Sequence, residues 1–151
     1  MHALAPSRAA RLGSRGIELP EPRNDAEIAA AAWACEMCAL ESAAAAMPDR
    51  KIGWWDFDLA LRDMRDALGQ IAGFFGFDAA PAVVEAIAAG LLMKRYSKAL
   101  EYDYSPTLRS DLIADAAWRH ERDLRGALAM LTAAAEKSPL LAQALRQAEG
   151  S

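Results

Sequence analysis

The segment Lys51-Ile52-Gly53-Trp54-Trp55-Asp56-Phe57 decides the fold that we expect for this chain. It is short and aromatic, and its apolar residues do not recur with the period of a helix. The turn residues Pro48 and Asp49 precede it. These features predict a buried β-strand over Lys51–Phe57, and no other segment has a comparable strand pattern. The expected fold is therefore mostly α: a helical domain with one short β-strand.

On both sides of this segment, apolar residues recur every three or four positions, which is typical of amphipathic helices. The first helix is expected to begin at Asn24, a good N-cap residue, with Glu27 completing a capping box, and to end at Pro48. The other predicted helices cover residues 61–75, with Gly76 as C-cap, residues 81–90, a long stretch from Ser105 to Leu131, and a short stretch from Pro139.

The composition agrees with a folded helical chain. Hydrophobic residues make up 54% of the 151 residues and charged residues 25%, a balance that excludes extensive disorder. Much of the hydrophobic fraction is alanine, the strongest helix former. Residues 1–23 contain three prolines and two glycines, so we expect a flexible or extended arm there. Residues 24–151 are expected to form a single mostly helical domain.

Charge and hydropathy indicate which kinds of partner and which cellular location to expect. The formal net charge is −4, which gives no general reason to expect nucleic acid as a partner. No uncharged apolar run reaches the roughly 18 residues that a membrane span requires. The N-terminal residues also lack the compact apolar core of a secretory signal, so a cytoplasmic location is expected.

Cys35 and Cys38 form a Cys-x-x-Cys pattern inside the first predicted helix. A zinc site needs about four ligands, and His2 and His120 are the only histidines in the sequence. A redox pair normally begins at the N-terminus of a helix, not in its middle. The two cysteines are therefore predicted to be structural thiols, and no metal site is expected.

The order of residues from Trp33 to Phe77 carries a family resemblance. Trp33 is followed by Glu36 on the first predicted helix, and an Asp56-Phe57-Asp58 triplet ends the predicted strand. Further along the chain come Asp63, Leu68, Ile71 and Phe74-Phe75-Gly76-Phe77. This order resembles the late portion of sulfotransferases that use 3′-phosphoadenosine 5′-phosphosulfate (PAPS). In that family, a strand with a Tyr-Glu-Asp-Leu-like segment precedes a helix of the pattern Asp-Pro…Leu…Ile…Phe-Leu-Gly.

The resemblance implies the C-terminal part of an α/β sulfotransferase fold, with PAPS as the cofactor. Lys94-Arg95-Tyr96-Ser97-Lys98 is similar to the basic segment near the family's C-terminus, which helps to grip the 3′-phosphate of the nucleotide. The residues that the resemblance assigns to this phosphate are Lys94, Arg95, Ser97 and Lys98. Cations and a hydroxyl suit a phosphate because they form charge-assisted hydrogen bonds with it. The alternative is a solvated basic turn between helices.

The chain also departs from the family. Met64 stands where the family usually has proline, and Asp56 and Phe57 stand where glutamate and aspartate are common. No segment matches the phosphosulfate-binding loop or supplies the catalytic base, so no catalytic residue is assigned. We therefore expect a truncated or reduced sulfotransferase-like protein that contributes part of the nucleotide clamp. Whether the chain is an enzyme by itself, and which acceptor it would serve, stay open.

A second hypothesis is a non-enzymatic helical interaction module. A single strand cannot form a stable sheet, so Lys51–Phe57 is expected to pair with strands outside this chain. A partner protein, or self-association through the lone strand, would supply them.

Several other residues have local explanations. Asp58 is predicted to cap the turn or helix after the strand, in preference to a catalytic role beside Asp56. His120 lies among charged residues and is predicted to be a surface histidine. The tyrosines in and after the basic segment are predicted to pack against neighbouring helices: Tyr96, Tyr102 and Tyr104.

Overall fold

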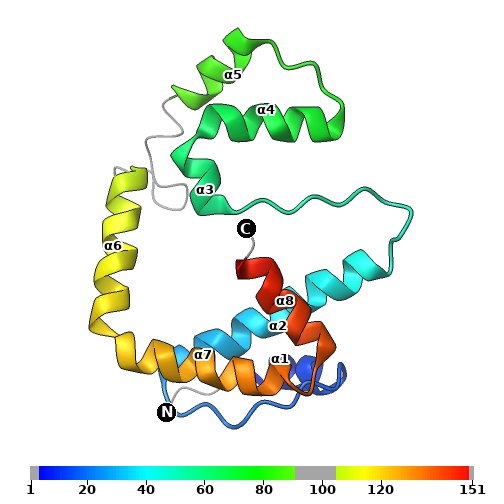
Figure 1. Cartoon of the computed structure of the whole chain (residues 1–151), viewed down its shortest axis with the longest axis vertical. Coiled ribbons are helices and arrows are strands. Elements are labelled where there is room, and N and C mark those ends of the chain that lie inside the picture. Colours follow the sequence, from blue (N-terminus) through cyan, green and yellow to red (C-terminus); the bar gives the residue numbers. More distant parts are fainter. Residues whose placement is uncertain (1–3, 91–104, 150–151) are drawn as a thin grey trace. The chain divides into compact units, whose positions relative to one another are not determined.

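The computed structural model describes residues 4–90 and 105–149 (Figure 1). Over these ranges the chain forms eight α-helices and no strand, so the prediction of a mostly helical fold is confirmed. The helices are α1 (Pro6–Gly13), α2 (Asp25–Ala45), α3 (Phe57–Arg62), α4 (Met64–Phe75), α5 (Pro81–Ala88), α6 (Pro106–Arg119), α7 (Glu121–Ala135) and α8 (Pro139–Glu149).

The strand predicted over Lys51–Phe57 is wrong. Residues 51–56 have no regular secondary structure, and the last residue of the segment is the first of α3. Asp56 starts this helix because its carboxylate accepts a hydrogen bond, 2.6 Å long, from the backbone N–H of Leu59. The ring of Trp55 packs edge-to-face on Phe74, with 4.8 Å between the ring centroids. A helix cap and an aromatic contact thus occupy the residues that were expected to pair in a sheet.

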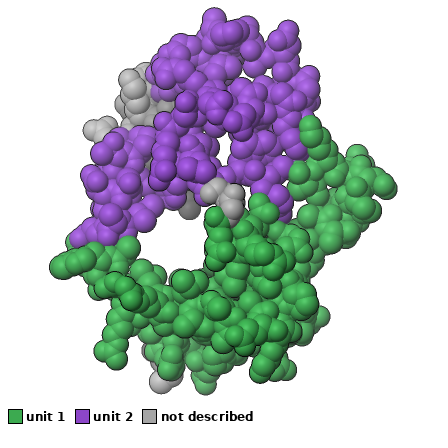
Figure 2. All heavy atoms as spheres, in the orientation of Figure 1, with its two compact units in different colours: residues 1–52, 117–150 green, residues 53–116, 151 purple. Residues whose placement is uncertain are grey.

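The chain divides into two compact units (Figure 2). Unit 1 contains residues 1–52 and 117–150, and unit 2 contains residues 53–116 and 151. The prediction of a single mostly helical domain over residues 24–151 stays a prediction. The N-terminal residues belong to unit 1 together with α2.

In unit 1, α2 packs against α1, α7 and α8, and α7 also packs against α8. Small side chains on α2, including Ala34, Cys35 and Cys38, are completely buried in this contact. They let the neighbouring helices approach closely, and Leu141 of α8 fills the space between them. The buried core cluster of unit 1 consists of Leu12, Ile17, Ala34, Cys35, Cys38, Met130, Leu131, Leu141 and Ala144.

The prediction of a flexible or extended arm over residues 1–23 is wrong for residues 6–13, which form α1. Pro6 lies at the start of this helix, where a proline loses no hydrogen bond. Leu12 at its end and Ile17 just after it are buried in the core of unit 1. An ion pair of 3.1 Å between Arg8 and Glu36 also joins α1 to α2. Tertiary packing thus makes a helix of a segment whose composition favours a connector.

The predicted start of α2 is confirmed. The side chain of Asn24 accepts a hydrogen bond of 2.9 Å from the backbone N–H of Glu27. The Glu27 carboxylate accepts from the backbone N–H of Arg23 at 2.7 Å, one residue before the expected partner in a capping box. By length and composition alone, α2 is also apolar enough to cross a membrane, a criterion that the core helix of a folded unit meets as well.

In unit 2, α4 packs against α3 and α5. Asp63 interrupts the helix that was predicted over residues 61–75. Its side chain caps α4 by accepting a 3.0 Å hydrogen bond from the backbone N–H of Asp66. Gly76 ends α4 at φ 74°, the left-handed conformation that favours glycine, so the predicted C-cap is confirmed. An ion pair between Arg65 and Glu85 links α4 to α5.

Candidate functional site

The four residues that the resemblance assigned to a phosphate lie outside the described residues: Lys94, Arg95, Ser97 and Lys98. The same holds for Tyr96, Tyr102 and Tyr104. Their roles therefore stay predictions.

A hollow in unit 2 that is lined by several charged side chains is the candidate site among the described residues. It has a volume of about 520 Å³ and lies between α3 and the first turns of α6. The described residues of its lining include two arginines, two carboxylates, two hydroxyls and the buried Leu61. The polar lining residues are Asp58, Arg62, Thr107, Arg109, Ser110 and Asp111.

An ion pair between Asp58 and Arg109 connects α3 to α6 across the hollow. The Nε of Arg109 donates to Oδ1 of Asp58 at 2.6 Å, and Nη2 donates to Oδ2 at 3.4 Å. The guanidinium also lies over the ring of Phe57, 5.4 Å from its centroid. The hydrogen bonds from Arg109 lower the pKa of the Asp58 carboxyl, against the opposing effect of burial. Asp58 is therefore held in its charged form.

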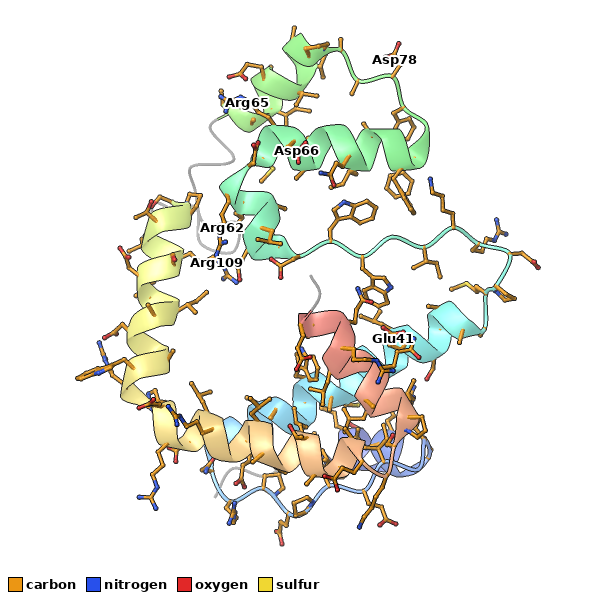
Figure 3. All side chains as sticks on the ribbon, in the orientation of Figure 1. Glu41, Arg62, Arg65, Asp66, Asp78 and Arg109 are labelled. Carbon is orange, nitrogen blue, oxygen red and sulfur yellow. The ribbon has the colours of Figure 1, made fainter. Side chains whose placement is uncertain are left out.

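Arg62 brings a second cation to the same hollow. It lies at the end of α3, and Figure 3 shows its side chain and that of Arg109 in the space between α3 and α6. The charge of Arg62 also lowers the pKa of Asp58, after the larger contributions of Arg109. Asp58 thus lies within reach of the fields of both arginines.

The chemistry that this lining supports is anion binding. Two guanidinium groups and the hydroxyls of Thr107 and Ser110 are hydrogen-bond donors. No group of three or more histidine, cysteine or acidic side chains is placed to hold a metal ion in residues 4–90 and 105–149. The described residues of the hollow's lining include no cysteine or histidine.

The other residues that were singled out from the sequence do not come together in one site among the described residues. The carboxylate that caps α3 belongs to Asp56, so the prediction of a cap at Asp58 was two residues off. His120 is exposed at the junction of α6 and α7, which confirms the prediction of a surface histidine. Cys35 and Cys38 are free and completely buried, and burial raises the pKa of the Cys38 thiol. These properties fit structural thiols.

The comparisons with known proteins add no relative. No protein-family model, curated protein or solved structure matches this chain. The resemblance to sulfotransferases accordingly rests on the residues quoted from the sequence.

Lowering the pH is expected to weaken the contact between α3 and α6. Because Arg109 lowers the folded-state pKa of Asp58 below 3.8, the unfolded chain binds more protons than the folded chain near that pH. The stabilisation is therefore fully present above pH 3.8 and is lost as the pH falls through the lower folded-state value. Urea unfolding across this acid range should show a smaller pH dependence in Asp58→Asn. An unchanged profile in that variant would contradict the ion pair.

Proposed function

We propose that this chain is a sulfotransferase-like protein, or part of one, that contributes to the nucleotide clamp of sulfuryl transfer from PAPS. The cations and the hydroxyl of the 94–98 segment would hold the 3′-phosphate. The observation that carries the proposal is the helix α4 with its two ends, because α4 occupies the stretch that the resemblance requires to be a helix.

The local structure of α4 supports the proposal in three respects. Asp63 stands at the acidic position that opens the family's helix, and here it is the N-cap of α4. Leu68 and Ile71 lie within the helix and are partly buried. Gly76 ends the helix in the left-handed conformation, as expected for the glycine of a Phe-Leu-Gly ending.

Binding the 3′-phosphate requires positively charged side chains. A phosphate monoester carries close to two negative charges, and lysine and arginine hold it through charge-assisted hydrogen bonds. In sulfuryl transfer, the acceptor hydroxyl or amine gives its proton to a general base as it attacks the sulfur. None of the described residues is assigned as that base, so the proposal covers binding of the nucleotide only.

Arg95→Ala is expected to abolish most of the binding of 3′,5′-adenosine diphosphate. A hydrogen bond to a charged group contributes about 1.5–3 kcal/mol, which corresponds to an affinity loss of roughly tenfold to a hundredfold. Isothermal titration calorimetry with the nucleotide measures this loss. Arg50→Ala is the matched control, since it removes one exposed cation outside the 94–98 segment. Equal losses in the two variants would argue for a nonspecific charge effect and against the clamp.

A second candidate function, self-association through unit 2, is favoured by its exposed apolar side chains. The helices α5 and α6 contain no buried residue. Phe77, after α4, is 70% exposed, and Leu112 on α6 is 60% exposed. Such residues are typical of a surface that another protein covers. Residues 51–56 form no strand, so self-association cannot proceed by strand pairing. The exposed faces of the helices would contact one another instead. Light scattering that finds only monomer at high concentration would contradict it.

A further inference from the structure

We propose that the hollow between α3 and α6 binds a tetrahedral oxyanion, phosphate or sulfate, through Arg62 and Arg109. The described residues that line it all belong to α3 and α6. The inference therefore goes beyond the proposed nucleotide clamp and stands on the described residues of unit 2 alone.

Arg62 supplies the donors of this site. Its side chain is exposed, lines the hollow, and forms no hydrogen bond or ion pair with any residue in the described part of the chain. A guanidinium has five N–H donors in a planar fork, which matches two oxygens of a phosphate or sulfate. Arg65, the other arginine of α3 and α4, differs in this respect, since it is already paired with Glu85.

Arg109 supplies the second positive charge at a fixed place. Asp58 engages it through Nε and Nη2 and thereby holds its guanidinium against α3. Asp58 with its two arginines carries one net positive charge. Because the ion pair is 38% and 48% exposed at its two side chains, it contributes little to stability. An incoming oxyanion can therefore share the arginines with Asp58 at small cost.

The other described lining residues determine which anion the hollow should prefer. The hydroxyls of Thr107 and Ser110 add neutral donors from the first turns of α6. Asp111 offsets the net positive charge of the described lining residues, so their combined long-range field is weak. Binding should then depend on direct hydrogen bonds and should favour a tetrahedral dianion over a monovalent carboxylate. A volume of about 520 Å³ also leaves room for a phosphate that is attached to a larger molecule.

The test is a titration of the whole chain with inorganic phosphate, followed by the side-chain Nε–H signals of Arg62 and Arg109 in NMR spectra. The ionic strength is kept constant with chloride, and sulfate and acetate are titrated in parallel. Saturable shifts of both signals are expected with phosphate and sulfate, and much weaker ones with acetate. Arg62→Gln should weaken the phosphate affinity about tenfold or more, read at the Arg109 signal.

Two further variants sharpen the result. Asp58→Asn removes the carboxylate that competes for the arginines and should tighten phosphate binding several-fold. Arg50→Gln, an exposed cation outside the hollow, should leave the affinity unchanged. A circular dichroism melt of each variant shows whether it is folded.

Two outcomes overturn the proposal: absence of saturable shifts at both arginine signals, or an unchanged affinity in folded Arg62→Gln. The proposed function fails by a different result, the absence of binding of 3′,5′-adenosine diphosphate to the intact chain, so the two failures are distinguishable. If Arg62→Gln has no effect while Arg95→Ala abolishes binding of 3′,5′-adenosine diphosphate, the oxyanion site is wrong and the clamp stands.

Discussion

Replacing Leu141 by alanine is expected to lower the free energy of unfolding of unit 1 by about 2–5 kcal/mol. Leu141 is 0% exposed and is the largest fully buried side chain among the described residues. It belongs to the core cluster in which α8 meets α2 and α7. Removing its isobutyl group loses apolar burial and leaves a cavity that the surrounding helices fill only in part.

Urea unfolding followed by circular dichroism measures this loss. Leu128→Ala is the matched control, because it is the same substitution on α7 at a side chain that is 58% exposed. That control should change the free energy of unfolding by about 0.5 kcal/mol or less. Equal effects of the two substitutions would contradict the placement of α8 on α2.

Replacing Glu41 by glutamine is expected to stabilise unit 1 by about 1–3 kcal/mol. Glu41, labelled in Figure 3, lies on α2 and is 4% exposed. Its Oε2 accepts a hydrogen bond of 2.6 Å from the side-chain amide of Gln143 on α8. Its Oε1 is buried with no hydrogen-bond partner within the described part of the chain. A buried carboxylate with an unsatisfied oxygen is costly, whereas a neutral amide of the same shape costs less to bury and can keep the bond from Gln143.

Thermal and urea unfolding of Glu41→Gln measure the gain. Glu36→Gln is the control on the same helix, since the Glu36 carboxylate is half exposed and paired with Arg8. That substitution should weaken stability slightly because it removes a surface ion pair. If Glu41→Gln instead destabilises the protein, the Glu41 carboxylate must have a partner that supports its charge.

The helices that the sequence predicted well have local start and stop signals. The N-cap Asn24 of α2, the C-cap Gly76 of α4 and the prolines at the start of α5, α6 and α8 act within a few residues of themselves. Pattern reasoning therefore places these ends. The breaks at Asp63 and His120 were missed, because apolar periodicity continues across both positions.

The wrong predictions concern features that depend on contacts distant in sequence. An aromatic run such as Trp54-Trp55 has high strand propensity, but strand formation needs a neighbouring strand, and here Trp55 packs on Phe74 instead. The helix α1 was missed because its stability comes from the burial of Leu12 in the core cluster of unit 1. The candidate site was missed for the same reason, since Asp58 and Arg109 lie 51 residues apart and no local pattern links them.

The central claim is that the chain holds the 3′-phosphate of a nucleotide. The measurement that tests it most directly is calorimetry of the intact chain with 3′,5′-adenosine diphosphate and, in parallel, with adenosine 5′-monophosphate, which lacks that phosphate. The account predicts saturable binding of the diphosphate and an affinity for the monophosphate that is lower by about tenfold or more. No binding of the diphosphate, or equal binding of the two nucleotides, would contradict it.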